Sequence, residues 1–119
     1  MERRRAQRLN IPLRVKCYLP SGGKIITEEV LAKNISGTGI GLSFKRPLNI
    51  GSRFKTLFYL PNDQQPISSV SEVVWCKKQI EDGKIYFDVG IEHNKISAKD
   101  KEKFVFLFCE TMINYSYDS

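Results

Sequence analysis

Residues Ile67–Lys78 read ISSVSEVVWCKK, residues Ile85–His93 read IYFDVGIEH, and the segment Glu81-Asp82-Gly83-Lys84 lies between them. Both flanking runs are rich in β-branched and aromatic residues, which favour strands. The Asp-Gly pair supplies the positive φ that a two-residue hairpin turn requires. The sequence therefore predicts two antiparallel strands joined by a tight turn. Apolar residues mark both strands: Val70, Val73, Val74 and Trp75 in the first, and Ile85, Phe87, Val89 and Ile91 on one face of the second.

Turn signals divide the preceding chain into four further strands, predicted over residues 13–19, 24–34, 40–44 and 54–60. Alternating apolar and polar residues mark the first, which the turn residues Pro20-Ser21-Gly22-Gly23 are expected to stop. The fourth is largely apolar but is interrupted by Lys55 and Thr56. Strands at this spacing, separated by turns, indicate an all-β architecture.

After the last strand the hydrophobic period becomes helical. Ser97 followed three residues later by Asp100 resembles a capping box, so a helix is expected over Ala98–Ile113. A core-facing stripe recurs at helical spacing: Phe104, Leu107, Phe108 and Met112. Val105 and Phe106 point elsewhere and extend the apolar surface towards a partner.

These elements predict a mainly β protein: a small six-stranded antiparallel β-barrel with one C-terminal α-helix covering one mouth or side. Closing the barrel removes the exposed edges that invite aggregation. A chain of 119 residues fits one domain with one core. We expect a single domain over 1–119, made of a flexible basic arm (1–12), a β-barrel (13–93) and the helix (97–113).

The net charge of +6 is concentrated at the start of the chain. Residues 1–16 hold six Lys or Arg against Glu2, whereas the remaining chain holds 13 Lys or Arg against 12 Asp or Glu. A localised positive field suits a phosphate-bearing partner, whether a nucleotide, a nucleic acid or an anionic membrane.

Other classes of function find little support in the sequence. The three cysteines are far apart and form no C-x-x-C pair, which predicts no disulfide framework and no metal site, and they are expected to be small core residues. No apolar run approaches the ~20 residues of a membrane span, so a cytoplasmic protein is expected. There is no G-x-S-x-G, Walker or H-E-x-x-H motif, and His93 stands alone, as expected of a structural or surface histidine. No catalytic residue is predicted.

Two short motifs gather residues suited to an anionic nucleotide. Four arginines crowd the first motif: Arg3, Arg4, Arg5 and Arg8. Each guanidinium offers a planar donor fork that fits phosphate oxygens or a guanine edge. The second motif places Asn34 and Ser36 beside glycines at 37, 39 and 41, where the missing Cβ allows close approach of a ligand.

In their order and separation, Arg4-x-x-x-Arg8 and Asn34-x-Ser36-x-x-Gly39 resemble the RxxxR and (D/N)xSxxG motifs of the PilZ family, bacterial cyclic di-GMP receptor domains. The resemblance covers nearly the whole chain. It implies that Arg4 and Arg8 meet the guanine and phosphates of this second messenger, with Arg3 or Arg5 adding charge. It also implies contacts from Asn34, Ser36 and the main chain at Gly39, with Gly37 and Trp75 as further candidates.

The resemblance implies a regulatory ligand rather than a cofactor, and signalling rather than catalysis. We expect the arm to order on binding and to change a surface that a protein effector or a fused domain recognises. Arg3 precedes the RxxxR motif, where family members often carry a basic residue and bind an intercalated pair of ligands. The chain could equally be free-standing or a piece of a longer protein.

Two alternative functions remain open from the sequence. A basic-armed β-barrel could bind nucleic acid, although the charge beyond residue 16 nearly cancels, which makes nucleic acid a less favoured partner. A PilZ-like adaptor could bind only protein, although members of that kind usually lack one or both motifs. Trp75 carries two interpretations as well, because a Trp beside Val73 and Val74 is more often a core residue than a stacking platform.

Overall fold

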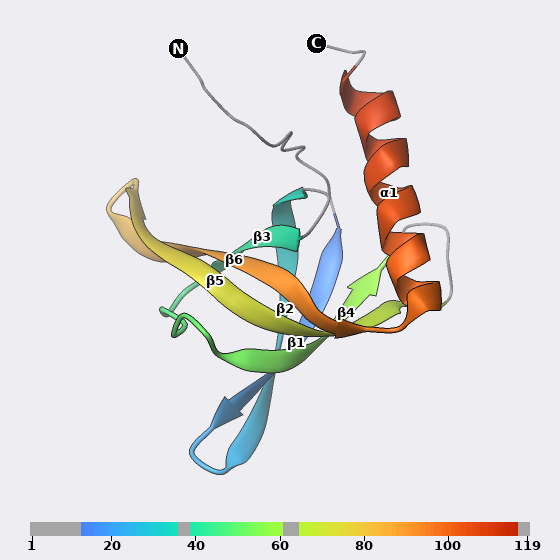
Figure 1. Ribbon diagram of the computed structural model, residues 1–119. Helices are drawn as coiled ribbons and strands as arrows, with labels where there is room; N and C mark the ends of the chain where they lie inside the picture. The colour runs from blue at the N-terminus through green and yellow to red at the C-terminus, as the bar shows by residue number, and fades with distance from the viewer. Residues whose placement is uncertain (1–12, 36–38, 61–64, 117–119) are drawn as a thin grey trace.

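The computed structural model describes residues 13–35, 39–60 and 65–116. The strands and the helix are β1 (Arg14–Ser21), β2 (Lys24–Ile35), β3 (Gly39–Phe44), β4 (Arg53–Tyr59), β5 (Ile67–Glu81), β6 (Lys84–Ile96) and α1 (Ala98–Ser116). Neighbouring strands are antiparallel and close into a barrel in the order β1-β2-β3-β6-β5-β4, with α1 beside it (Figure 1). The predicted mainly β fold, an antiparallel six-stranded barrel with a C-terminal helix, is confirmed.

The two long hairpins turn on residues with positive φ. Asp82 and Gly83 have φ of 51° and 75°, which confirms the predicted Asp-Gly turn between β5 and β6. At the other hairpin the prediction was wrong by two residues, because β1 continues through Pro20 to Ser21. There Gly22 and Gly23 alone make the turn, with φ of 54° and 80°. Both hairpins project beyond the barrel (Figure 1).

The core is built from side chains that point into the barrel from every strand, together with one residue of α1. Burial alternates along β1, as expected of a strand with one face towards the core. Val15, Cys17 and Leu19 are buried, and the residues between them are not. The buried apolar residues are Leu13, Val15, Cys17, Leu19, Ala32, Ile35, Ile40, Leu42, Phe44, Phe54, Phe58, Ile67, Val73, Val89, Ile91 and Phe104.

A chain of hydroxyl groups runs through this core. Thr56 Oγ1 lies 2.7 Å from Ser71 Oγ, and Ser69 Oγ lies 3.3 Å from Ser71 Oγ. Thr56 was expected to interrupt the fourth strand, but it is fully buried within β4. Val70, between the two serines, faces outward and is half-buried. Buried hydroxyls are tolerated here because they hydrogen-bond to one another.

Helix α1 begins at the predicted N-cap and docks through one stripe. The Asp100 N–H donates to Ser97 Oγ at 3.1 Å, while the Asp100 carboxylate accepts from the Ser68 N–H of β5 at 3.3 Å. Phe104 is buried, and Leu107 and Phe108 are partly buried against the core. The helix continues to Ser116, three residues beyond the predicted end.

His93 joins the hydroxyl chain to α1. Its Nδ1 lies 3.0 Å from Ser69 Oγ, and its ring makes edge contacts with Phe58 and Phe104 at centroid distances of 5.6 and 4.2 Å. Its Nε2 is buried and has no hydrogen-bond partner among the described residues. Burial lowers the pKa of His93 to about 4, and the charge of Lys101 adds to this effect. The predicted structural role is confirmed, and the ring is neutral near pH 7.

We expect the free energy of unfolding to fall as the pH drops from about 6.5 towards 4. The pKa of His93 is lower in the folded protein than in the unfolded chain, so the unfolded state binds more protons in this window. The loss is about 2 kcal/mol after allowance for partial exposure. Denaturant titrations at several pH values would measure it, with His93→Phe as the comparison. The variant should lack this part of the pH dependence of stability. An identical pH dependence in both proteins would contradict its assignment to His93.

Candidate functional site

Four residues form one cross-strand row on the outer face of the barrel. Asn34 of β2 pairs with Gly41 of β3, Gly41 pairs with Gly90 of β6, and Gly90 pairs with Trp75 of β5. The two central positions carry no side chain, and the planar side chains of Asn34 and Trp75 stand at the two ends of the row. We call this row the glycine shelf.

The two planar side chains lie over the glycines beside them. A Cβ added at Gly41 would lie 2.6 Å from Asn34 Oδ1, and one added at Gly90 would lie 2.1 Å from Trp75 Nε1. The Asn34 amide offers both donors and an acceptor, and the indole offers an aromatic face. Amide edges and aromatic faces are the groups that proteins use to hold planar nucleobases. The shelf therefore has the shape and chemistry for a flat, polar ring.

Two β-bulges bring the ends of the shelf into line. The register of β2 with β3 shifts between Ala32 and Asn34, and that of β5 with β6 shifts between Val73 and Trp75. Without these extra residues, Asn34 and Trp75 would point inward, on the same side as Ala32 and Val73. Trp75 is thus an outer-face residue and not the core residue that its sequence neighbours suggest.

Charged residues border the shelf on the side of Lys33. Its Nζ lies 3.0 Å from Asp88 Oδ1 and 5.1 Å from the centre of the Tyr86 ring. Burial alone would lower the pKa of Lys33, but the hydrogen bond and charge of Asp88 outweigh burial and raise it, so the ammonium stays protonated. On the other side of the shelf, Glu92 pairs with Gly39. Lys77 of β5 is the cross-strand neighbour of Asp88, so the described border holds two lysines, Lys33 and Lys77, against Asp88 and Glu92.

Gly39 has a structural reason to be glycine. It is buried, and an added Cβ would lie 2.1 Å from the carbonyl oxygen of Ile91 on β6. The close approach of β3 to β6 thus requires this glycine, whatever its role towards a ligand. Its predicted contact with a ligand stays a prediction.

The other predicted binding residues lie outside the described residues: Arg3, Arg4, Arg5, Arg8, Ser36 and Gly37. Leu13, the first described residue, is buried, and its carbonyl oxygen accepts a hydrogen bond from the Ala32 N–H at 2.7 Å. Ala32 precedes Asn34 by two residues on β2. Residues 1–12 therefore join the barrel close to the shelf, and the five residues from Arg8 to Leu13 span at most ~18 Å.

Sequence reasoning missed Gly90 and the Lys33–Asp88 pair. A signal for Gly90 was present, because a glycine between Val89 and Ile91 interrupts an apolar strand and marks a close approach by another group. No comparable signal linked Lys33 to Asp88, which are 55 residues apart in the chain.

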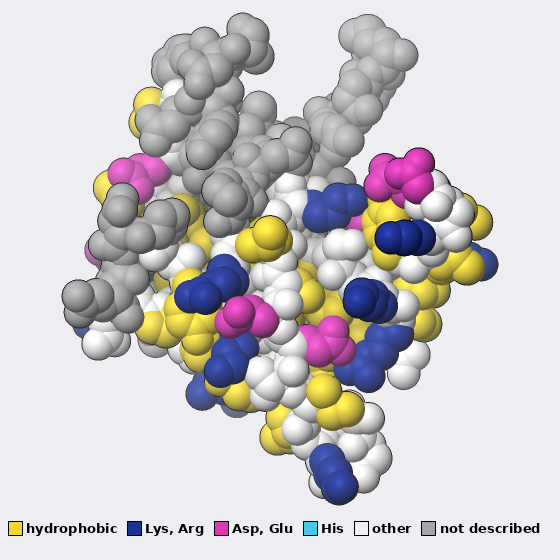
Figure 2. All heavy atoms as spheres, turned by 180° about the vertical axis from the view of Figure 1, so that it is seen from behind, with side chains coloured by type: hydrophobic (Ala, Val, Ile, Leu, Met, Phe, Trp, Pro, Cys, Tyr) yellow, Lys and Arg dark blue, Asp and Glu magenta, His cyan; other side chains and the backbone are white. Residues whose placement is uncertain are grey.

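The rest of the described surface carries charges of both signs. Ion pairs join Arg14 to Glu29 at 3.8 Å, Arg46 to Glu28 at 2.7 Å, and Arg53 to Glu72 at 3.1 Å. Figure 2 shows Lys and Arg side chains interspersed with acidic and apolar ones on the face behind that of Figure 1. A continuous basic track of the kind that follows a nucleic-acid backbone is not visible on that face.

The cysteines differ in environment. Burial, with Glu28 adding to it, raises the pKa of Cys17 to about 12, so this thiol stays protonated. Cys76 is half-buried and Cys109 is exposed, so the expectation of three core cysteines was wrong for Cys109. In the described part of the chain, no three His, Cys, Asp or Glu side chains gather as metal ligands would. None of the described helices is long and apolar enough to span a bilayer.

Comparison with known proteins identifies one family. The family model described as "PilZ domain" matches residues 2–108. A search of curated proteins finds no significant match.

Several solved structures share the fold. K. pneumonia MrkH in its apo state superposes with a TM-score of 0.79 at 15% identity, over 99% of this chain and 53% of that one. The Bacillus subtilis inhibitor of motility MotI/DgrA gives 0.72 at 19% identity, over 97% and 54%. The PilZ domain of YcgR from Escherichia coli gives 0.68 at 14% identity, over 98% and 97%. The chain spans just over half the length of MrkH and MotI.

Replacement of Gly39 by Ala should destabilise the fold. The added Cβ would meet backbone of β6, which cannot move aside as a side chain can, and we expect a loss of about 2 kcal/mol or more in the free energy of unfolding. Denaturant unfolding would measure it, with Ser43→Ala on the same face of β3 as a control that should stay within about 0.5 kcal/mol. Equal stability of the two variants would show that β3 and β6 are farther apart than described.

Proposed function

The chain belongs to the PilZ domain family, and from that membership we propose that it binds cyclic di-GMP on the glycine shelf, clamped by the arginines of residues 1–12. The observation that carries the proposal is the cross-strand row in which the planar side chains of Asn34 and Trp75 lie over two glycines. Two structures with the same fold, K. pneumonia MrkH and the E. coli YcgR domain, were solved with c-di-GMP.

A guanine of the ligand suits the shelf in three ways. Its edge carries donors and acceptors, which the Asn34 amide can meet together. Its ring can stack on the Trp75 indole, a contact worth about 1–3 kcal/mol per base in other proteins. The missing side chains at Gly41 and Gly90 let the Asn34 amide and the Trp75 indole lie flat on the barrel, so that both can face a planar ring. Ser36, Gly37 and Gly39 are proposed to complete this side of the site.

The phosphates require more positive charge than the described border of the shelf supplies, because Asp88 and Glu92 offset the charges of Lys33 and Lys77 there. The arginine cluster supplies it. Arg8 is five residues from Leu13, which lies beside β2, so its guanidinium is within reach of the shelf. Arg4 and Arg8 contact guanine and phosphate in this proposal, and Arg3 and Arg5 add charge; Arg3 also favours an intercalated pair of ligands.

The response that we propose is a change in the arm and not a reaction. Binding neutralises the arginine cluster, orders it against the barrel and creates a new protein-interaction surface. The partner that recognises that surface is a protein effector or a fused domain, and we place the receptor in the cytoplasm. The ligand is regulatory and not a cofactor, and no catalytic role is proposed for any residue.

Two observations weigh against the alternative functions. Nucleic-acid binding is less favoured because three arginines of the barrel are engaged in ion pairs with glutamates. An adaptor that binds only protein is less favoured because both motifs are intact and the shelf is formed.

Arg8→Ala should weaken binding of cyclic di-GMP about 10- to 100-fold, as expected for a lost bidentate contact to guanine or phosphate. Isothermal titration would measure the affinity and stoichiometry, with GTP, cyclic di-AMP and a short single-stranded DNA as competing ligands. Lys24→Ala removes the same charge at the tip of the β1–β2 hairpin and should bind like the parent. The thermal midpoint should be unchanged in both variants, since neither loses an apolar side chain. Preference for DNA over the dinucleotide would overturn the proposal.

Trp75 is the single tryptophan of the chain, so its fluorescence reports directly on the shelf. Saturating cyclic di-GMP should quench it, because a guanine would stack on the indole. Asn34→Ala should raise the concentration needed for half-quenching about tenfold, since a buried polar contact is lost, while Ser43→Ala on the neighbouring strand should leave it unchanged. Binding seen by calorimetry without any change in fluorescence would place the ligand away from Trp75.

A further inference from the structure

Helix α1 carries a second apolar stripe that the barrel does not cover. Val105, Phe106 and Ile113 are 42%, 63% and 59% exposed, although each is a large hydrophobic residue. Ala98 and Cys109 are exposed as well. At 100° per residue these five positions, together with Glu102, fall on the side of the helix that faces away from Phe104 and its neighbours. We call this set the outer stripe.

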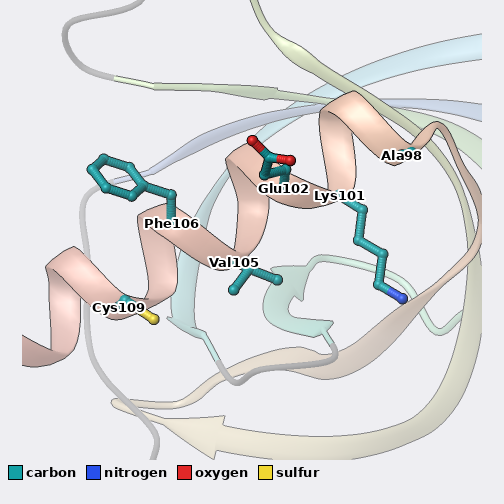
Figure 3. Close-up of a pocket in the computed structure, with 6 residues that line it drawn as sticks. All are labelled: Ala98, Lys101, Glu102, Val105, Phe106 and Cys109. Atoms are coloured by element: carbon teal, nitrogen blue, oxygen red, sulfur yellow. The ribbon is translucent and has the colours of Figure 1, made fainter.

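The outer stripe is a surface of α1 alone. A shallow hollow is lined by Ala98, Lys101, Glu102, Val105, Phe106 and Cys109, and Figure 3 shows that all six project from this one helix. The barrel lies along the opposite side of α1, against Phe104, Leu107 and Phe108. Another helix could therefore approach the stripe without meeting the barrel.

One flank of the stripe carries charges that are self-complementary. Lys99 and Glu110 are 11 residues apart, which is about three helical turns, so both lie on the same flank of the stripe. They are exposed and separated by about 16 Å along the axis, too far to pair within one helix. Along the helix axis their midpoint is level with Val105, at the centre of the stripe from Ala98 to Ile113.

We propose that the outer stripe docks on the same stripe of a second copy of this chain, with the two α1 helices antiparallel and the two-fold axis beside Val105. A two-fold axis of this kind places each flank of one helix opposite the same flank of the other helix, which runs in the reverse direction. Lys99 then faces Glu110 of the partner subunit, and Glu110 faces Lys99 of the partner subunit. Val105, Phe106 and Cys109 lie between these two ion pairs and are buried against the same residues of the second copy, and Glu102, the charged member of the stripe, lies among them.

A second copy fits this surface better than an unrelated partner for one reason. An isologous interface must be complementary to itself. One flank of the stripe meets this requirement, because it carries a basic and an acidic residue at equal distances from the centre. The proposal does not rest on nucleotide binding, and its test contains no ligand.

Charge exchange tests the pairing. Sedimentation equilibrium over a range of concentrations should show a monomer–dimer equilibrium for the parent chain. Lys99→Glu alone and Glu110→Lys alone should each weaken dimerisation roughly tenfold, because symmetry turns two attractions into two repulsions. The double variant restores both pairs with their signs exchanged and should dimerise within about threefold of the parent. A parent chain that stays monomeric would overturn the proposal and would leave residues 1–12 or another protein as the occupant of the stripe. A double variant that dimerises more weakly than either single variant would overturn it as well.

A cysteine at the axis gives an independent readout. Val105→Cys in a Cys109→Ser background should form an intermolecular disulfide on mild oxidation, since the two-fold axis brings position 105 of both copies together. Ile25→Cys in the same background places a more exposed thiol on the β1–β2 hairpin and should not cross-link. Equal cross-linking of both variants would indicate random collision and would count against the pairing.

Discussion

The outer face of β3 and β6 depends on two β-bulges. Each bulge inserts one residue, Lys33 in β2 and Val74 in β5, and so exchanges the inward and outward positions that follow it. Ile35 thereby enters the core while Asn34 leaves it. Trp75 leaves the core in the same way. Because both bulges border the same pair of glycines, Asn34 and Trp75 converge on one row, so the irregularities of the barrel also create the shelf.

The two glycines make this convergence possible. Any side chain at Gly41 or Gly90 would occupy the space that the Asn34 amide and the Trp75 indole now fill. Tryptophan over a strand glycine also restores the contact area that glycine lacks, so the shelf contributes to stability before any ligand arrives. A site built on paired strands is rigid, so ordering its residues for ligand binding costs little free energy. In the proposed mechanism, that cost falls on the arm.

The hairpins, the N-cap and most core positions could be predicted from the sequence, because each depends on residues that are a few places apart in the chain. The Asp82-Gly83 turn and the Ser97 cap are of this kind. The outward position of Trp75 could not be predicted, since strict alternation from Val73 would place it in the core and a bulge leaves no local signature. The hydroxyl chain from Thr56 to His93 was equally hidden, because three strands that are distant in sequence contribute to it.

Strand β5 connects the shelf to the helix, since it carries Trp75 at one point and, seven residues away, Ser68, whose N–H bonds Asp100 of α1. This continuity does not by itself transmit a signal. A slip of one residue in a closed barrel would exchange core and solvent faces along a whole strand, so β5 has no second register of similar energy. Coupling between sites requires an element with two arrangements. Of the parts that take part in the proposed mechanism, the arm is the one that changes its contacts on binding, so the response to the ligand belongs there and the α1 pairing is expected to be independent of it.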